Sequence, residues 1–145
     1  MINIDLLIIS GPNLNLLGMR EVHIYGNESL DEIMAWLENS IDGLNHHFKF
    51  YQSNSEGELI NIMQDERQWA SGILLNAGAF SHYSYAIADT IKAIQIPTIE
   101  IHMSDINKRE SFRKKSVLKN VCKKSIIGHG KHSYLKGLQY LNQTN

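Results

Sequence analysis

Five short apolar runs alternate with stretches of helical pattern along the chain, and this alternation constrains the fold more than any other feature. The runs cover residues 4–9, 48–51, 72–75, 98–101 and 125–127. Short apolar runs bounded by turn residues are typical of buried strands. Because a helical stretch separates consecutive runs, the strands are expected to be parallel and covered by helices on both faces. We therefore predict an α/β, flavodoxin-like, doubly wound five-stranded parallel sheet with strand order 2-1-3-4-5.

The helices expected between these strands differ in how clearly the sequence marks them. In the first, apolar residues share one helical face from Leu30 to Leu44, Ile41 included, and Ser29 with Glu32 forms a capping box. The second is expected over residues 56–69, and the third over 84–94, before Pro97. The last two are expected over 106–113 and 133–141, with a frayed tail after them.

Size and composition limit the classes of protein that this chain can belong to. We expect 145 residues to form one domain, 1–145, and a formal charge of −1 argues against a general nucleic-acid binder. The single Cys122 rules out a disulfide within the chain. The N-terminus lacks the pattern of a signal peptide, and no apolar run reaches membrane-spanning length. These features predict a cytoplasmic protein with no membrane segment.

A loop of about sixteen residues follows the first strand, and loops of that length are usually functional or disordered. This one is too apolar for a disordered linker. It begins near Asn13 and carries Arg20 and Tyr25, five residues apart. A guanidinium beside a phenol favours the phenolate, which is a base. The alternative is that Arg20 is a solvated charge and Tyr25 a core aromatic.

Polar side chains concentrate where the predicted strands end, and ligands of such sheets bind beyond those ends. His82 and His102 lie at or just past strand ends. Glu100 is two residues before His102, so both side chains point to one face and the carboxylate can orient the imidazole. Arg109 and Arg113 share a face of the short helix and could hold a carboxylate. Structural histidines and a solvated basic face remain the alternatives.

Three other kinds of site have weaker support. The run from Gly128 to His132 lacks phosphate-loop spacing and the first strand has no GxGxxG after it, which argues against a module that only binds a nucleotide or flavin. Ser10 and Ser104 lie in no GxSxG elbow, which argues against a hydrolase. The histidines form no metal-binding motif, so we expect no metal.

The segments GPNLNLLGxRE…IYG, QSNxEGEL, LLNAGAFSH, IEIHxSxIxxRExFR and IIGHG occur in this order along nearly the whole chain. In this respect the chain resembles the type II 3-dehydroquinate dehydratases. The resemblance implies a flavodoxin-like subunit, a homododecamer built of trimers, and no cofactor. It also implies dehydration of 3-dehydroquinate to 3-dehydroshikimate through an enolate, in the shikimate pathway or in quinate catabolism.

The same resemblance assigns roles to individual residues. It implies that Tyr25 is the base, that Arg20 stabilises its ionised form, and that His102, oriented by Glu100, is the acid. Asn13 would hold a water against the enolate oxygen. The residues that would contact substrate are Asn76, His82, Met103, Ser104, Arg109, Arg113 and Asp89, the last from a neighbouring subunit. The chain departs from the common family pattern at Tyr51, Asp105, Asn107 and Ser133.

Overall fold

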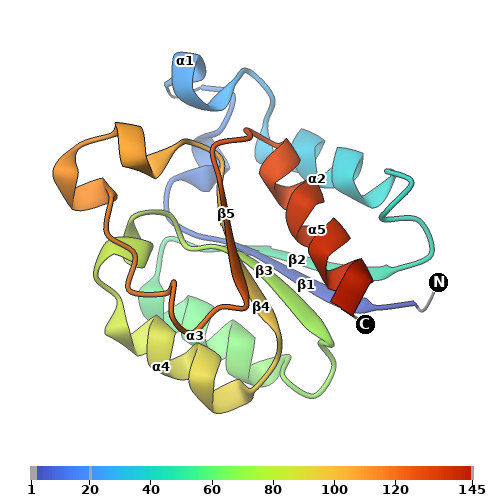
Figure 1. Cartoon of the computed structure of the whole chain (residues 1–145). Helices are drawn as coiled ribbons and strands as arrows, with labels where there is room; N and C mark the ends of the chain where they lie inside the picture. The colour runs from blue at the N-terminus through green and yellow to red at the C-terminus, as the bar shows by residue number, and fades with distance from the viewer. Residues whose placement is uncertain (1–2, 20, 145) are drawn as a thin grey trace.

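A computed structural model describes residues 3–19 and 21–144 of the chain. Its five strands are β1 (Asp5–Ser10), β2 (His47–Gln52), β3 (Gly72–Asn76), β4 (Thr98–His102) and β5 (Lys124–Ile127). They form one parallel sheet in the order β2-β1-β3-β4-β5 (Figure 1). The predicted fold class and strand order are therefore confirmed.

Helices cover both faces of the sheet. Helices α2 (Leu30–Glu38) and α5 (His132–Thr144) lie on one face, and α3 (Glu56–Asp65) and α4 (Tyr85–Ile94) lie on the other (Figure 1). Alternate residues of β1 explain this arrangement, because Leu6 and Ile8 belong to the α2–α5 core whereas Leu7 and Ile9 belong to the α3–α4 core. All four are almost completely buried.

The described part of the long loop after β1 contains local helical structure. It contains a 3-10 turn, η1 (Leu14–Leu16), and a one-turn helix, α1 (Val22–Tyr25), which the apolar pattern did not predict. Helix α1 buries none of its residues and stands at the edge of the molecule in Figure 1. Its chain direction is set by Gly18 and Gly26, which both have positive φ.

The first predicted helix is too long at its C-terminal end. Ser29 and Glu32 form the expected capping box, but α2 ends at Glu38, and Ile41 is 86% exposed. Ser40 donates a hydrogen bond back to the carbonyl of Leu37, which closes a turn. Ile41 and Leu44 therefore do not lie on a buried helical face, although their apolar spacing predicts one.

Three other boundaries also differ from the sequence prediction. Residues 106–113 form two 3-10 turns, η3 (Ile106–Lys108) and η4 (Ser111–Arg113), because Asp105 caps the first and the backbone of Arg109 is extended. Helix α3 ends at Asp65 rather than near residue 69. The predicted frayed tail is wrong up to Thr144, since α5 continues to that residue and Asn142 donates to the carbonyl of Asp42.

The packing of α5 gives a prediction about stability. A Cβ on Gly137 would lie 2.7 Å from Ile101 Cδ1 and 3.0 Å from Leu74 Cδ2, so Gly137→Ala should lower the free energy of unfolding by about 1–3 kcal/mol. A Cβ on Gly57 in α3 would meet only Ser55 Oγ, at 4.0 Å, so the same change there should raise the free energy of unfolding by about 0.4–1 kcal/mol. Urea unfolding of both variants tests this pair, and equal effects would contradict the packing argument.

Candidate active site

A polar cavity of about 100 Å³ lies at the carboxyl ends of β3 and β4. It is walled by the loop after β1, the 3-10 turn η2 (Gly78–His82) that follows β3, and the segment that follows β4. Nine of the residues singled out from the sequence line it: Asn13, Tyr25, Asn76, His82, His102, Met103, Ser104, Arg109 and Arg113. The parallel sheet thus brings together residues that are up to 100 positions apart in the sequence.

The predicted pair of Glu100 and His102 is formed. Both side chains project from β4, and His102 Nε2 lies 2.6 Å from Glu100 Oε2. The two residues are 1% and 6% exposed, so this contact is shielded from water. Burial of the Glu100 carboxyl opposes its ionisation, but the hydrogen bonds and charge of its neighbours outweigh burial and lower its pKa. The pair therefore contains a carboxylate that can hold an imidazole in place.

His82 is held differently. Its Nδ1 lies 2.8 Å from the carbonyl oxygen of Lys115, and because a carbonyl only accepts, Nδ1 carries the proton. Burial lowers the pKa of His82, and the positive charges of His102 and Arg113 also disfavour its protonation. His82 is therefore a neutral imidazole whose Nε2 can accept a hydrogen bond.

The phenol of Tyr25 is bound by a guanidinium, but the described contact comes from Arg109. Arg109 Nη1 donates to the Tyr25 hydroxyl at 2.6 Å and to Ser104 Oγ at 3.4 Å, and Arg109 Nη2 lies 3.9 Å from Glu21 Oε1. Tyr25 is half-buried, lines the cavity and also packs against the α2–α5 core, so it lies at the boundary between the two. Arg20, the predicted partner of Tyr25, lies outside the described residues.

The remaining cavity residues are fixed mainly through the backbone and through Tyr134. Asn76 Nδ2 donates to the buried Tyr134 hydroxyl at 3.1 Å, and Asn76 Oδ1 accepts from Gly78 N. Asn13 has a left-handed backbone, and its N–H donates to Asn54 Oδ1. The carbonyl oxygen of Met103 accepts from Gly130 N. These contacts set the positions of the strand-end loops around the cavity.

One expectation about the cavity residues is not met. Arg109 and Arg113 do not share a helical face, because the helix predicted for them is absent, yet both reach the cavity. Asp89 is exposed on α4 and does not line the cavity of its own subunit, so its predicted contact with a neighbouring subunit's cavity stays a prediction. The four departures from the family pattern, at Tyr51, Asp105, Asn107 and Ser133, also lie outside the cavity lining.

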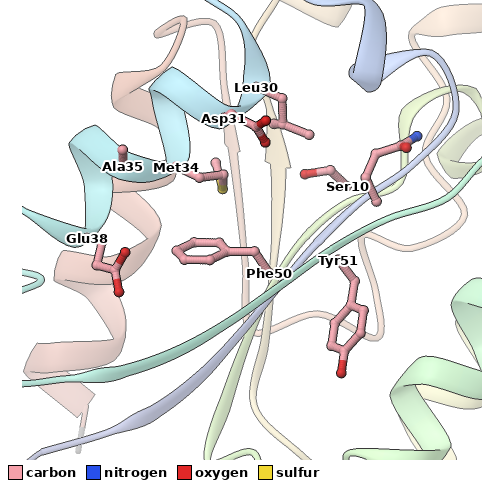
Figure 2. Close-up of a pocket in the computed structure, with 9 residues that line it drawn as sticks. Ser10, Leu30, Asp31, Met34, Ala35, Glu38, Phe50 and Tyr51 are labelled. Atoms are coloured by element: carbon pink, nitrogen blue, oxygen red, sulfur yellow. The ribbon is translucent and has the colours of Figure 1, made fainter.

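A larger hollow of about 280 Å³ lies between α2 and β2, but it lacks the predicted catalytic groups. Figure 2 shows Phe50 directed toward α2, whereas Tyr51 points to the other side of the sheet, where its hydroxyl donates to Glu66. Apart from Asp31 and Glu38 on α2, its walls are mainly apolar or carry neutral polar groups. Of the two sites, the smaller polar cavity therefore has the side chains needed for proton transfer.

The alternative sites drawn from the sequence gain no support. The hydroxyl of Ser10 contacts the Tyr134 hydroxyl, and that of Ser104 contacts Arg109, so the described partners of these serines are not imidazoles. Within residues 3–19 and 21–144, no three His, Cys, Asp or Glu side chains are grouped to hold a metal ion. In the same residues, no helix has the length and apolar character needed to cross a bilayer.

Some residues hold the cavity side chains in place without lining the cavity, and these were not identified from the sequence. Ser116 and Ser125 donate to the Glu100 carboxylate, and the Lys115 carbonyl orients His82. Ser125 could have been found, because it is opposite Glu100 in the register of β4 and β5. Ser116 and Lys115 follow η4 in an irregular segment, where no periodic pattern reports their direction.

A doubly wound sheet with acid, base and cationic side chains at its carboxyl edge defines a small α/β enzyme acting on a polar substrate. The family described as dehydroquinase class II matches residues 4–142, and the chain belongs to this family.

Individual relatives agree over nearly the whole length. The chain is 46% identical over 138 residues to the 3-dehydroquinate dehydratase of Caldicellulosiruptor bescii, covering 94% of this chain and 95% of the relative. It is 44% identical over 137 residues to that of Nitratiruptor sp., covering 94% and 88%. The crystal structure of type II dehydroquinase from Butyrivibrio crossotus matches with a TM-score of 0.93 at 40% identity, covering 97% of this chain and 98% of that one.

Proposed function

We propose that this chain is a single catalytic domain that dehydrates 3-dehydroquinate to 3-dehydroshikimate through an enolate. The observation that carries the proposal is that a phenol held by a guanidinium and an imidazole held by a carboxylate line the same cavity. One pair can serve as base and the other as acid, which an elimination of water requires. The product is a conjugated enone, so its ultraviolet absorbance measures the reaction, with a chelator present to remove metal ions.

The first step is removal of a proton from the carbon next to the ketone, and Tyr25 is the base. Arg109 donates to the phenol oxygen at 2.6 Å, a distance typical of strong charge-assisted hydrogen bonds. This contact holds the phenol oxygen in place, and as the base it takes the proton while the electron pair of the C–H bond moves to the ketone oxygen. Asn13 lines the cavity and is assigned to hold a water against the resulting enolate oxygen.

The second step is loss of the hydroxyl group, and His102 is the acid. Because Glu100 occupies Nε2, the other ring nitrogen, Nδ1, is assigned to give its proton to the departing hydroxyl. The enolate electrons reform the carbonyl and the ring double bond while the C–O bond breaks, and water leaves. The ionised Glu100 carboxylate accepts from Nε2 and fixes the ring orientation.

The rest of the cavity is assigned to substrate binding. Arg113, Ser104 and the Met103 backbone are suited to a carboxylate and hydroxyls, since together they supply a guanidinium, a hydroxyl and an N–H group. Neutral His82 can accept a hydrogen bond from a substrate hydroxyl, and buried Asn76 offers its amide. A cavity of about 100 Å³ would have to open further to admit a cyclic polyhydroxy acid.

The proposed base can be tested by removing one oxygen atom. Tyr25→Phe should lower kcat by at least about 100-fold while leaving the fold intact, because the ring and its packing are kept. Tyr140→Phe in α5 is the matched control, since this tyrosine lies outside the cavity lining. Activity of Tyr25→Phe within about tenfold of the unmodified enzyme would exclude Tyr25 as the base.

The cation that acts on Tyr25 can be identified from pH–rate profiles. Arg109→Ala should lower kcat, and part of the activity should return at high pH, where solvent hydroxide ionises the phenol unaided. Lys108→Ala removes the same charge from a highly exposed side chain and should leave the profile unchanged. If Arg20→Ala shows recovery at high pH and Arg109→Ala does not, Arg20 is the cation and Arg109 has another role.

We also propose a homododecamer of trimers, located in the cytoplasm. Contact between subunits is supported by the exposed face of α4, where Tyr85 is 62% exposed and precedes Asp89 by one helical turn. Neighbouring Tyr83 is 58% exposed, and apolar surface of this kind favours contact with a second subunit.

If α4 meets a neighbouring cavity, Asp89→Ala should lower both kcat and the oligomer mass measured by analytical ultracentrifugation. Asp65→Ala, at an exposed position on α3, is the control and should change neither. A fully active monomer of the unmodified chain would contradict the shared site without affecting the roles of Tyr25 and His102.

A further inference from the structure

The buried carboxylate of Glu100 receives more than the bond from His102. Ser116 Oγ lies 2.5 Å from Glu100 Oε2, and Ser125 Oγ lies 2.7 Å from Glu100 Oε1. These serines come from two different segments, since Ser125 is in β5 and Ser116 follows η4. Both carboxylate oxygens of a residue that is 1% exposed are therefore bonded.

The direction of the bond from Ser116 is fixed by a further contact. The backbone N–H of Leu118 donates to Ser116 Oγ at 3.2 Å, so the hydroxyl accepts there. An ionised carboxylate can only accept, and the single hydroxyl hydrogen of Ser116 therefore points to Glu100. Leu118 is completely buried, which anchors this chain of donors in the core.

Ser116 and Ser125 do not line the cavity that contains Tyr25 and Arg109. Together with Glu100 and His102 they line a separate hollow of about 170 Å³, which Lys114 and Lys119 also border. His102 lines both spaces and stands between them. The direct contact of the two serine hydroxyls with the catalytic groups is therefore through Glu100, which bonds His102.

We propose that Ser116, assisted by Ser125, is a positioning residue for the elimination, acting through Glu100 on His102. Its hydroxyl keeps the carboxylate ionised and aligned, so that His102 Nε2–H stays directed at Glu100 and Nδ1 stays directed at the cavity. The proposal rests on the proposed function, because it assigns a role in the step that protonates the leaving hydroxyl.

The segment around Ser116 supports both histidines of the cavity. The carbonyl of Lys115 accepts from His82 Nδ1, and the next residue donates to the partner of His102. The backbone N–H of Val117 donates to the carbonyl of Ser81, which ties this segment to η2. One short segment therefore fixes His82 as a neutral acceptor and His102 as a donor from Nδ1.

A kinetic test separates positioning from substrate binding. Ser116→Ala should lower kcat about tenfold and change KM by less than about threefold, because the lost contact orients a proton donor and touches no substrate. Ser116→Thr keeps the hydroxyl and should restore most of kcat. Ser40→Ala, which removes another half-buried hydrogen-bonded hydroxyl at the end of α2, is the control.

The path through His102 is tested in a second background. In His102→Ala, the change Ser116→Ala should have no further effect on kcat, because the residue on which it acts is absent. A second tenfold loss there would overturn the proposal, as would a loss confined to KM or a failure of Ser116→Thr to restore activity.

A stability measurement tests the same contact without any turnover. The charged or titratable groups near Glu100 are His102, His82, Cys122, Lys114 and Lys119. The pKa of Glu100 is lowered in the folded protein, so its ionisation stabilises the fold above the usual carboxyl range and this stabilisation is lost as the pH falls through the lowered value. The destabilisation caused by Ser116→Ala should therefore be larger at neutral pH than at a pH below the lowered value, where Glu100 is protonated in the folded protein.

Removing the titrating group provides the control for that measurement. In a Glu100→Gln background, the effect of Ser116→Ala on the free energy of unfolding should no longer depend on pH. An effect of equal size at both pH values in the unmodified protein would overturn the proposal. Absence of turnover of 3-dehydroquinate by the unmodified protein would refute the proposed function alone, because the link from Ser116 to the Glu100 charge is read from stability.

Discussion

The cavity depends on one buried charge. Glu100 lies in β4 inside the sheet, where an unpaired carboxylate would be strongly unfavourable. The fold satisfies it with donors from β4, from β5 and from the segment that follows η4. These donors come from separate parts of the chain. By accepting from all of them, the carboxylate fixes their positions relative to one another, and they in turn keep it ionised. The geometry around His102 follows from this requirement.

The two histidines of the cavity show how environment divides chemical roles between identical side chains. His82 donates from Nδ1 to a backbone carbonyl, and burial disfavours its charged form. His102 donates from Nε2 to the ionised Glu100 carboxylate, which leaves Nδ1 as its remaining ring nitrogen. One imidazole is thereby suited to accept a hydrogen bond and the other to donate one from Nδ1, although His102 ends β4 and His82 follows the neighbouring parallel strand β3.

Much of the fold could be predicted because short apolar runs indicate where the strands lie. The strand order then follows from the helical crossovers that parallel strands require. The pairing of Glu100 with His102 could also be predicted, since residues two apart on a strand share a face. The end of α2 could not, because Ile41 has helical spacing but a turn at Ser40 places it in solvent. Apolar periodicity does not register local hydrogen bonds that end a helix.

Contacts between distant segments were the least predictable part of the site. Arg109 reaches Tyr25 across 84 positions, from a segment predicted to be helical that in fact has an extended backbone at Arg109. Resemblance placed both residues at the site but could not show which guanidinium contacts the phenol. Ser116 could not be identified from the sequence, because its contact with Glu100 depends on how an irregular segment runs relative to β4.

The weak packing of α1 follows from what the cavity has to do. Helix α1 carries Tyr25 but buries no residue completely, so its place over the cavity relies on the partial packing of Tyr25 against the α2–α5 core and on the contact with Arg109. The ends of the surrounding loop are held more firmly, by Gly11 N–H donating to the Asn76 carbonyl and by Glu28 paired with Lys131. A wall fixed at its ends and held by exchangeable contacts in the middle can open for a substrate without disturbing the core. The groups that position His102 are instead anchored in buried strands, so opening the Tyr25 side leaves the acid side in place.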